Sequence, residues 1–211
     1  MRIPIARQGF PFIALGLAVV AFFLWLDFSI GWGLAGLLTL FVVAFFRDPE
    51  RSLPQEEGTL LAPADGKVLL IEEVEATPFA KGRAIKISIF MSVFNCHINR
   101  IPWSGKIKDI RHRSGKFFPA DKERASVENE QNALLLKADN GQFISMVQVA
   151  GLIARRIVCW VRNGETVKRG DRFGLIRFGS RVDLYLPLST RLRVKRGDRV
   201  KAGLTVMGEW P

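Results

Sequence analysis

The sequence has few of the residues that build disulfide frameworks or metal centres. Its 211 residues include only two cysteines, Cys96 and Cys159, and two histidines. Two widely separated cysteines form neither a disulfide framework nor a paired zinc knuckle, and they give no reason to expect an oxidising compartment. The sequence also offers no other cluster of metal ligands, so no metal is expected. Long amphipathic helix patterns are lacking as well, and the helix candidate is near residues 121–129.

Acidic residues are scarce relative to basic ones. There are 20 Asp and Glu against 31 Lys and Arg, which gives a net charge of +11. Such a balance predicts an anionic partner: nucleic acid, an anionic membrane surface or a phosphate-bearing substrate. Nucleic acid is not expected, because the sequence lacks the interleaved aromatic and basic residues of RNA-binding modules and a helix that could read a groove. Disorder is excluded by an apolar content of 48%.

Charge is also missing from almost all of residues 10–46, where Asp27 is the exception. A single helix over this block would be about 55 Å long at roughly 1.5 Å per residue. It would place Asp27 near the centre of a hydrocarbon core about 30 Å thick, at considerable cost. Two helices joined by a turn at residues 27–33 fit better. Each would have about 17 residues, the lower limit for spanning, so two full spans and a shallow re-entrant hairpin both stay open.

Basic residues flank this apolar block on both sides: Arg2, Arg7, Arg47 and Arg51. The positive-inside rule therefore predicts that both ends lie at the cytoplasmic face of the cell membrane. Trp25 and Trp32 flank the predicted turn, as aromatic residues do at membrane interfaces. We therefore expect residues 1–51 to form a membrane-associated helical hairpin with basic flanks.

Residues 52–211 consist of short apolar segments separated by glycine-containing turns, which is the pattern of a β-rich domain. The segments expected as strands are residues 67–71, 84–90, 133–136, 143–150 and 181–186. We therefore predict a mainly β fold: a lipoyl-like β-sandwich catalytic domain behind an N-terminal hydrophobic helical hairpin.

One heptapeptide occurs twice in this domain. Residues 167–173, Val-Lys-Arg-Gly-Asp-Arg-Phe, return as residues 194–200 with a final valine. The glycine can supply a turn position with φ > 0, and such half-motifs are common in lipoyl-type β-sandwiches. If the repeat had a functional role, the domain would be a swinging-arm carrier. A structural turn used twice is favoured, because no lysine is presented at a hairpin tip as in a carrier.

Three short segments hold side chains that can do chemistry. Asp65 lies in Leu-Ala-Pro-Ala-Asp-Gly-Lys-Val, His97 lies in Phe-Asn-Cys-His-Ile-Asn-Arg-Ile-Pro, and Ser180 lies in residues 177–187. Taken singly, each has a structural explanation as a turn or a packed residue. Together, aspartate, histidine and serine can activate a hydroxyl. A plain serine hydrolase is a poor fit, because the G-x-S-x-G elbow is absent.

In this order, behind an apolar hairpin, the three segments resemble the phosphatidylserine decarboxylases, in particular the short, archaeal-like subfamily of these pyruvoyl-dependent enzymes. The resemblance covers nearly the whole chain and is most specific in residues 177–187. Members of the family cut themselves between a glycine and a serine, which match Gly179 and Ser180 here. Asp65 and His97 match the family aspartate and histidine. Arg181 is a departure, because longer members commonly have threonine after the serine.

The resemblance implies that Ser180 attacks the carbonyl of Gly179, with His97 as the base and Asp65 orienting it. β-Elimination and loss of ammonia would leave a covalent pyruvoyl group at position 180. The products would be a large chain, 1–179, and a small chain, 180–211, held together as a heterodimer. The pyruvoyl group would form a Schiff base with the amine of phosphatidylserine and accept electrons as CO2 leaves, giving phosphatidylethanolamine without a metal.

The expected partners are a phospholipid substrate and the membrane, with a larger homo-oligomer left open and no nucleic acid. The basic excess suits anionic headgroups, and Arg111, Arg113 and Lys116 are candidates for the surface patch. Two alternatives remain. The substrate could be the related archaetidylserine, because these motifs do not fix the lipid backbone. The chain could also be a non-enzymatic membrane adaptor with a lipoyl-like domain, which predicts one uncut polypeptide.

Overall fold

The computed structural model of the chain describes residues 3–122, 124–152, 156–177 and 179–210. Arg2 of the predicted basic flank, Glu123 of the predicted helix and Phe178 beside the predicted cleavage pair lie outside these residues. The chain divides into two compact units, Met1–Glu50 and Arg51–Pro211. The division falls one residue before the predicted boundary, and the Arg51 side chain bonds within the second unit.

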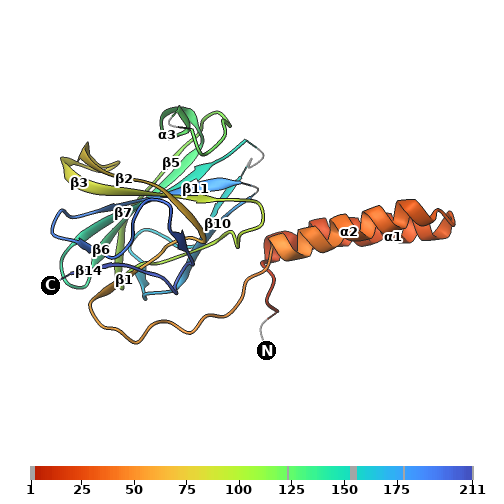
Figure 1. Ribbon diagram of the computed structural model, residues 1–211, viewed down its shortest axis with the longest axis horizontal. Coiled ribbons are helices and arrows are strands. Elements are labelled where there is room, and N and C mark those ends of the chain that lie inside the picture. Colours follow the sequence, from red (N-terminus) through yellow and green to blue (C-terminus); the bar gives the residue numbers. More distant parts are fainter. Residues whose placement is uncertain (1–2, 123, 153–155, 178, 211) are drawn as a thin grey trace. The chain divides into compact units, whose positions relative to one another are not determined.

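The first unit is a helical hairpin (Figure 1). A 3-10 turn η1, Arg7–Gly9, leads into helix α1, Phe10–Trp25, and a short turn connects it to helix α2, Ser29–Phe45. The turn was expected over residues 27–33, but it is shorter, since α2 already begins at Ser29. The chain reverses at Asp27, whose φ is +52°, a left-handed conformation that aspartate adopts more readily than most residues.

Small residues bring the two helices close together. A Cβ atom on Gly16 of α1 would lie 2.4 Å from the hydroxyl oxygen of Thr39 on α2, and one on Gly31 of α2 would lie 2.7 Å from the ring of Phe23 on α1. Such contacts between small residues are typical of helices that pack in membranes.

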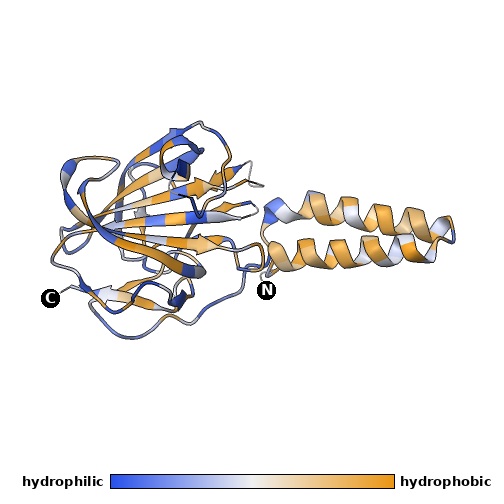
Figure 2. Cartoon of the chain, turned by 45° about the horizontal axis from the view of Figure 1, so that its top comes forward, coloured by the Kyte–Doolittle hydropathy of each residue, from blue (hydrophilic) through white to orange (hydrophobic). Residues whose placement is uncertain are grey.

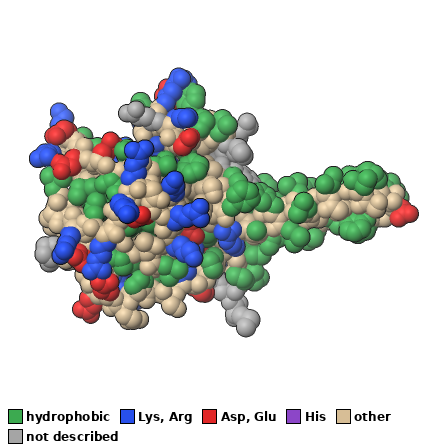
Figure 3. Space-filling model, viewed as in Figure 1, with side chains coloured by type: hydrophobic (Ala, Val, Ile, Leu, Met, Phe, Trp, Pro, Cys, Tyr) green, Lys and Arg blue, Asp and Glu red, His purple; other side chains and the backbone are tan. Residues whose placement is uncertain are grey.

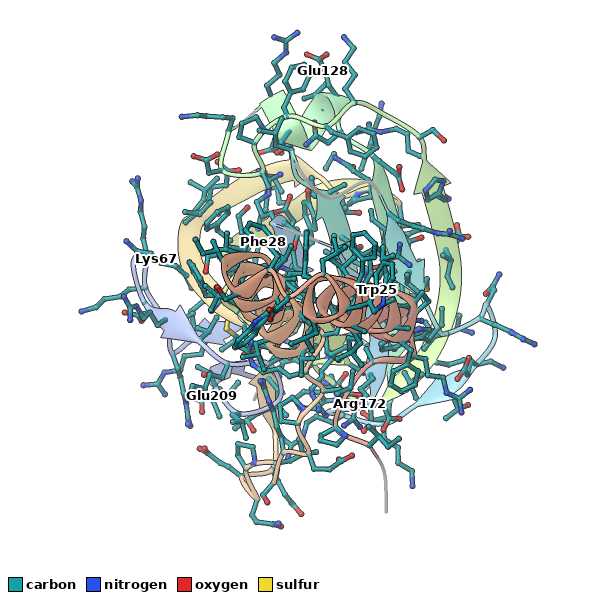
Figure 4. All side chains as sticks on the ribbon, turned by 90° about the vertical axis from the view of Figure 1, so that its right-hand side faces the viewer. Trp25, Phe28, Lys67, Glu128, Arg172 and Glu209 are labelled. Carbon is teal, nitrogen blue, oxygen red and sulfur yellow. The ribbon has the colours of Figure 1, made fainter. Side chains whose placement is uncertain are left out.

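Hydrophobic side chains stand out along the face of the hairpin that Figure 3 shows, and most residues of both helices are hydrophobic (Figure 2). Trp25 is 79% exposed and Phe28 is 49% exposed at the turn end (Figure 4). By length and composition, the helical stretch Arg7–Trp25 can cross a membrane, whereas Ser29–Phe45 is shorter. A hairpin that exposes many apolar side chains is suited to a lipid environment.

In the second unit, the described strands form antiparallel sheets. The large sheet has the strand order β13-β2-β3-β11-β7-β6-β5-β9, and the two small ones have the orders β1-β14-β12 and β4-β10-β8. The strands of the large sheet are β2 (Gly66–Ala76), β3 (Lys81–Met91), β5 (Gly105–Arg113), β6 (Gln131–Ala138), β7 (Phe143–Ala150), β9 (Thr166–Val167), β11 (Ser180–Leu186) and β13 (Arg199–Val200). Those of the small sheets are β1 (Thr59–Leu61), β4 (Ile98–Arg100), β8 (Ile157–Cys159), β10 (Arg172–Ile176), β12 (Arg191–Leu192) and β14 (Val206–Glu209).

One hydrophobic core joins these sheets into a sandwich. Buried side chains of the large sheet, such as Ile89 and Leu184, belong to the same cluster as Phe173 of β10 and Met207 of β14. The prediction of a mainly β sandwich domain accompanied by a helical hairpin is confirmed. Helix α3, Arg124–Glu128, is shorter than the helix expected near residues 121–129.

The predicted strands are found in β2, β3, β6, β7 and β11, and the bounds of β7 agree with the prediction. Strands β5 and β10 were not expected. In β5, exposed charged residues interrupt the apolar pattern, and β10 has Gly174 at its centre. Both strands depend on pairing with distant neighbours, which a local pattern does not reveal.

The repeated heptapeptide forms the same turn twice, as the structural reading predicted. Gly170 and Gly197 have φ values of +87° and +98°. In each turn an aspartate side chain accepts a hydrogen bond from the backbone three residues earlier: Asp171 from Lys168 at 2.7 Å, and Asp198 from Lys195 at 2.9 Å. The repeat therefore serves as a turn that leads into a strand.

Candidate active site

Ser180 is the first residue of β11, a central strand between β3 and β7. In the two ladders it faces Met91 and Ala150. Because side chains alternate along a strand, Ser180 shares the core face of the sheet with Val182 and Leu184. Its side chain is fully buried, and its hydroxyl donates to the sulfur of Met91 at 3.4 Å. A hydroxyl is thus placed inside the core at the end of a strand.

Gly179, which precedes this serine, has an unusual conformation and an unusual neighbour. Its φ is +68°, which glycine adopts without strain. Its carbonyl group packs against Gly151, the residue after β7, so closely that a Cβ atom there would lie 2.2 Å from the oxygen and 2.9 Å from the carbon. The Gly179–Ser180 peptide can occupy this position only because residue 151 has no side chain.

A chain of buried amide side chains leads to the Ser180 region. Asn132 donates to Gln148 at 2.9 Å, and Gln148 donates to Asn99 at 2.8 Å. Asn99 in turn donates to the sulfur of Met91 at 3.6 Å, the same atom that accepts from Ser180. All of these side chains are buried. These amides were not predicted from the sequence, although an amide inside an apolar strand segment is a usable signal, because buried polar groups need partners.

His97 is fully buried just before β4. Its Nδ1 lies 3.0 Å from the carbonyl oxygen of Asn95. A carbonyl oxygen can only accept a hydrogen bond, so Nδ1 carries the hydrogen and Nε2 is the basic nitrogen of the neutral ring. The Asn95 side chain accepts from the backbone and hydroxyl of Ser92, which fixes this turn. The carbonyl of Asn95 therefore favours the His97 tautomer that carries its hydrogen on Nδ1.

Asp65 lies in the turn before β2 and is 7% exposed. Its carboxylate forms a two-point ion pair with Arg51, at 2.6 and 2.8 Å, and accepts the backbone N–H of Ala202 at 2.8 Å. On the ring of His97, Nδ1 lies against the carbonyl oxygen of Asn95. That Asp65 orients His97 stays a prediction.

The Asp65 segment nevertheless lies beside the His97 segment. The backbone N–H of Arg100, at the end of β4, donates to the carbonyl of Pro63 at 2.9 Å. The carbonyl of His97 accepts from Ile176 of β10 at 3.4 Å. The structure thus links the Asp65 and His97 segments, and the strand that precedes Ser180, through backbone contacts.

Positive charge gathers near the Gly179–Ser180 peptide. Arg177 lies two positions before Gly179, and its backbone N–H donates to the carbonyl of Arg156 at 3.3 Å. Burial, followed by the nearby positive charge of Arg156, lowers the pKa of Arg177. Two arginines that influence each other, one of them two positions before Gly179 in the chain, suit a substrate that carries a phosphate. Among the described residues, no three His, Cys, Asp or Glu side chains gather as metal ligands would.

Over nearly its full length, the chain is similar in sequence to known proteins of one family. A family model described as phosphatidylserine decarboxylase matches residues 38–208, which include all three segments. A phosphatidylserine decarboxylase proenzyme of Ralstonia nicotianae is 48% identical over 206 residues, covering 97% of this chain and 95% of that protein. Proenzymes of the same description from Desulfotalea psychrophila and a Geobacter species are 47% and 51% identical, each covering 99% of this chain and 97% of their own length.

Proposed function

The chain belongs to the phosphatidylserine decarboxylase family, and we propose that it matures by cutting itself between Gly179 and Ser180. It decarboxylates phosphatidylserine to phosphatidylethanolamine and CO2 in phospholipid biosynthesis. Its relatives are described as proenzymes, which supports self-processing. Neither archaetidylserine as the substrate nor a non-enzymatic adaptor role is favoured by this likeness.

The observation that carries the proposed cleavage site is the geometry of one peptide group. The buried Ser180 hydroxyl follows a glycine with φ +68°, whose carbonyl packs closely against the backbone of Gly151. Attack begins when the hydroxyl turns away from the sulfur of Met91, a weak acceptor that competes little for the proton. Oγ then bonds to the carbonyl carbon of Gly179, the peptide C–N bond breaks, and an ester with a free amine results.

His97 is the proposed base for this step. Its Nδ1 lies against the carbonyl oxygen of Asn95, and we assign Nε2 as the nitrogen that receives the proton of Ser180. Asp65 is assigned to the site as a positioning group. Its ion pair with Arg51 fixes the segment whose Pro63 carbonyl bonds to β4, directly after His97.

The ester then loses the Cα proton of residue 180, and its Cβ–Oγ bond breaks. Gly179 leaves as a carboxylate, and the dehydroalanine at position 180 tautomerises, takes up water and releases ammonia to become pyruvoyl. The pyruvoyl carbonyl supplies the electron sink that decarboxylation requires. No metal takes part in the proposed reaction.

The two products, 1–179 and 180–211, should stay together as a heterodimer. The small chain begins with β11, which is hydrogen-bonded to β3 on one side and β7 on the other. Its later strands β13 and β14 pair with β2 and β1. Because these ladders do not depend on the cut bond, cleavage leaves the sandwich whole.

The substrate is a membrane lipid, and the N-terminal unit contains a helix apolar and long enough to cross a bilayer. We assign residues 1–51 to a membrane-associated hairpin and residues 52–211 to a catalytic domain at the cytoplasmic face of the cell membrane. Basic residues near the hairpin ends attract anionic lipids, at about 1 kcal/mol for each well-placed Lys or Arg.

The direct test of this function is an assay of the purified full-length protein on phosphatidylserine vesicles. We expect release of CO2 and accumulation of phosphatidylethanolamine, both lost after treatment with phenylhydrazine, which captures a reactive carbonyl. Activity that survives this treatment would contradict the pyruvoyl group while leaving the decarboxylase assignment in place.

A further inference from the structure

Residues 118–122, between β5 and α3, lie beside the Gly179–Ser180 peptide. The position that a Cβ atom on Gly151 would occupy is 2.2 Å from the carbonyl oxygen of Gly179 and 3.4 Å from the Cβ atom of Ala120. Ala120 is 3% exposed. This segment, which we call the cover segment, therefore adjoins the carbonyl group that the serine attacks.

The side chain of Asn129 anchors the cover segment at its start. This buried amide accepts the backbone N–H of Phe118 at 2.9 Å and donates to the carbonyl of the same residue at 2.7 Å. It also donates to the carbonyl of Ala150, at 2.7 Å. Ala150 faces Ser180 in the β-ladder, so this end of the cover segment is fixed to the strand beside the serine.

Arg181 anchors the rest of the segment, and it directly follows the reacting serine. Its guanidinium donates to the carbonyl of Ala120 at 3.1 Å and to the hydroxyl of Ser126, on α3, at 2.5 Å. A buried ion pair with Asp183, at 2.8 Å, balances its charge. Arg181 and Asp183 are 4% and 2% exposed. The planar fork of an arginine allows one side chain to make all of these contacts.

We propose that Arg181 is a positioning residue that holds the cover segment against the Gly179–Ser180 bond and thereby keeps water from the ester intermediate. This inference rests on the proposed self-cleavage. The contacts explain why a large, charged side chain is buried next to the serine, at the position where the sequence departs from the longer members of the family.

Keeping water away matters because the ester has two fates. In elimination, the Cα proton leaves, the Cβ–Oγ bond breaks, Gly179 departs as a carboxylate, and residue 180 becomes pyruvoyl after losing ammonia. In hydrolysis, water adds to the ester carbonyl and the carbonyl C–Oγ bond breaks. Gly179 again departs as a carboxylate, but residue 180 remains an ordinary N-terminal serine. Water is needed later to release ammonia, but by then no ester is left to hydrolyse.

The test is the intact mass of the small chain from purified full-length variants. A pyruvoyl-started chain is lighter than a serine-started chain by the mass of one ammonia. Ser126→Ala removes one anchor and leaves the ion pair intact. The double variant Arg181→Met with Asp183→Leu removes the anchor without leaving a buried charge alone, an exchange that proteins often tolerate. Arg83→Met is the control, because Arg83 is an exposed arginine that pairs with Glu73 and Glu75 in the β2–β3 region.

We expect the wild type and Arg83→Met to yield pyruvoyl-started small chains. In the anchor variants, the ratio of serine-started to pyruvoyl-started chain should rise at least about tenfold, which corresponds to about 1.4 kcal/mol between the two barriers. Simple destabilisation would slow cleavage without changing this ratio. The inference is wrong if folded anchor variants keep the wild-type ratio, or if they remain uncut, since the segment would then act before the ester forms. An uncut wild type would instead refute the proposed self-cleavage.

Discussion

The carbonyl oxygen of Gly179 packs against Gly151 so closely that a Cβ atom at position 151 would lie 2.2 Å from it. The two residues continue the β7–β11 ladder beyond the Ala150–Ser180 pair, at the point where the strands end. Backbone thus meets backbone without intervening side chains. Because residue 151 has no side chain, the peptide that Ser180 is proposed to attack can lie directly against it.

We predict that Gly151→Ala slows self-cleavage strongly. The new methyl group must push the carbonyl of Gly179 away, and a misplacement of about 1 Å can cost on the order of 100-fold in rate. The measurement is the time course of small-chain appearance after synthesis in vitro. Gly36→Ala is the matched control, because a Cβ atom there meets no other atom within 4 Å. Wild-type maturation of Gly151→Ala would show that the observed carbonyl position is not the reactive one.

His97→Ala should abolish or greatly slow maturation, because it removes the proposed base. His112→Ala is the control, since His112 is exposed and lies 3.4 Å from Glu130. Gel electrophoresis of freshly made protein measures the fraction of cleaved chain. Circular dichroism must show that both variants are folded. A loss confined to His112→Ala would assign the base to the other histidine.

Asp65→Ala should lower stability and slow maturation together. It leaves the side chain of Arg51, only 8% exposed, without its carboxylate. Removal of one partner from a buried ion pair typically costs about 3–5 kcal/mol. Thermal unfolding and the extent of cleavage are the two measurements.

The double variant Arg51→Met with Asp65→Leu separates two possible roles of Asp65. If Asp65 acts by positioning its segment, an apolar pair should restore both stability and cleavage. A double variant that is stable yet uncut would show that the carboxylate itself takes part in the chemistry.

The sequence predicted the architecture well because its signals are local. An uncharged block interrupted by Asp27 predicts a hairpin, and an apolar run such as residues 143–150 predicts a strand. Side-chain partners could not be predicted in the same way. The pairing of Asp65 with Arg51, and of Arg181 with Ala120 and Ser126, depends on the packing of distant segments. The three short segments identify Asp65, His97 and Ser180 as candidate reactive groups. They do not show which hydrogen-bond partners these side chains have.

Deletion of residues 1–46 should separate self-cleavage from lipid turnover. Every residue of the proposed site remains, and self-cleavage is intramolecular, so the shortened chain should still mature if it folds. Its activity on phosphatidylserine in bilayers should fall sharply, whereas activity on a soluble short-chain phosphatidylserine should fall far less. The ratio of the two activities, before and after truncation, is the measurement.

Other outcomes of the truncation would change the role of the hairpin. An equal fall on both substrates would make it part of the fold or of an oligomer. If neither activity falls, basic residues such as Arg111, Arg113 and Lys116 suffice for docking. High salt should then abolish the bilayer activity, because the screening length shrinks to about 3 Å at 1 M salt.

The central claim is that the chain cuts itself between Gly179 and Ser180, and the intact mass of the purified protein tests it most directly. We predict two masses for the wild type, those of residues 1–179 and of a small chain 180–211 that begins with pyruvoyl. Ser180→Ala should give one uncut chain. A wild-type protein found only as a single chain of 23.7 kDa, or a Ser180→Ala variant that still splits at this bond, would contradict the account.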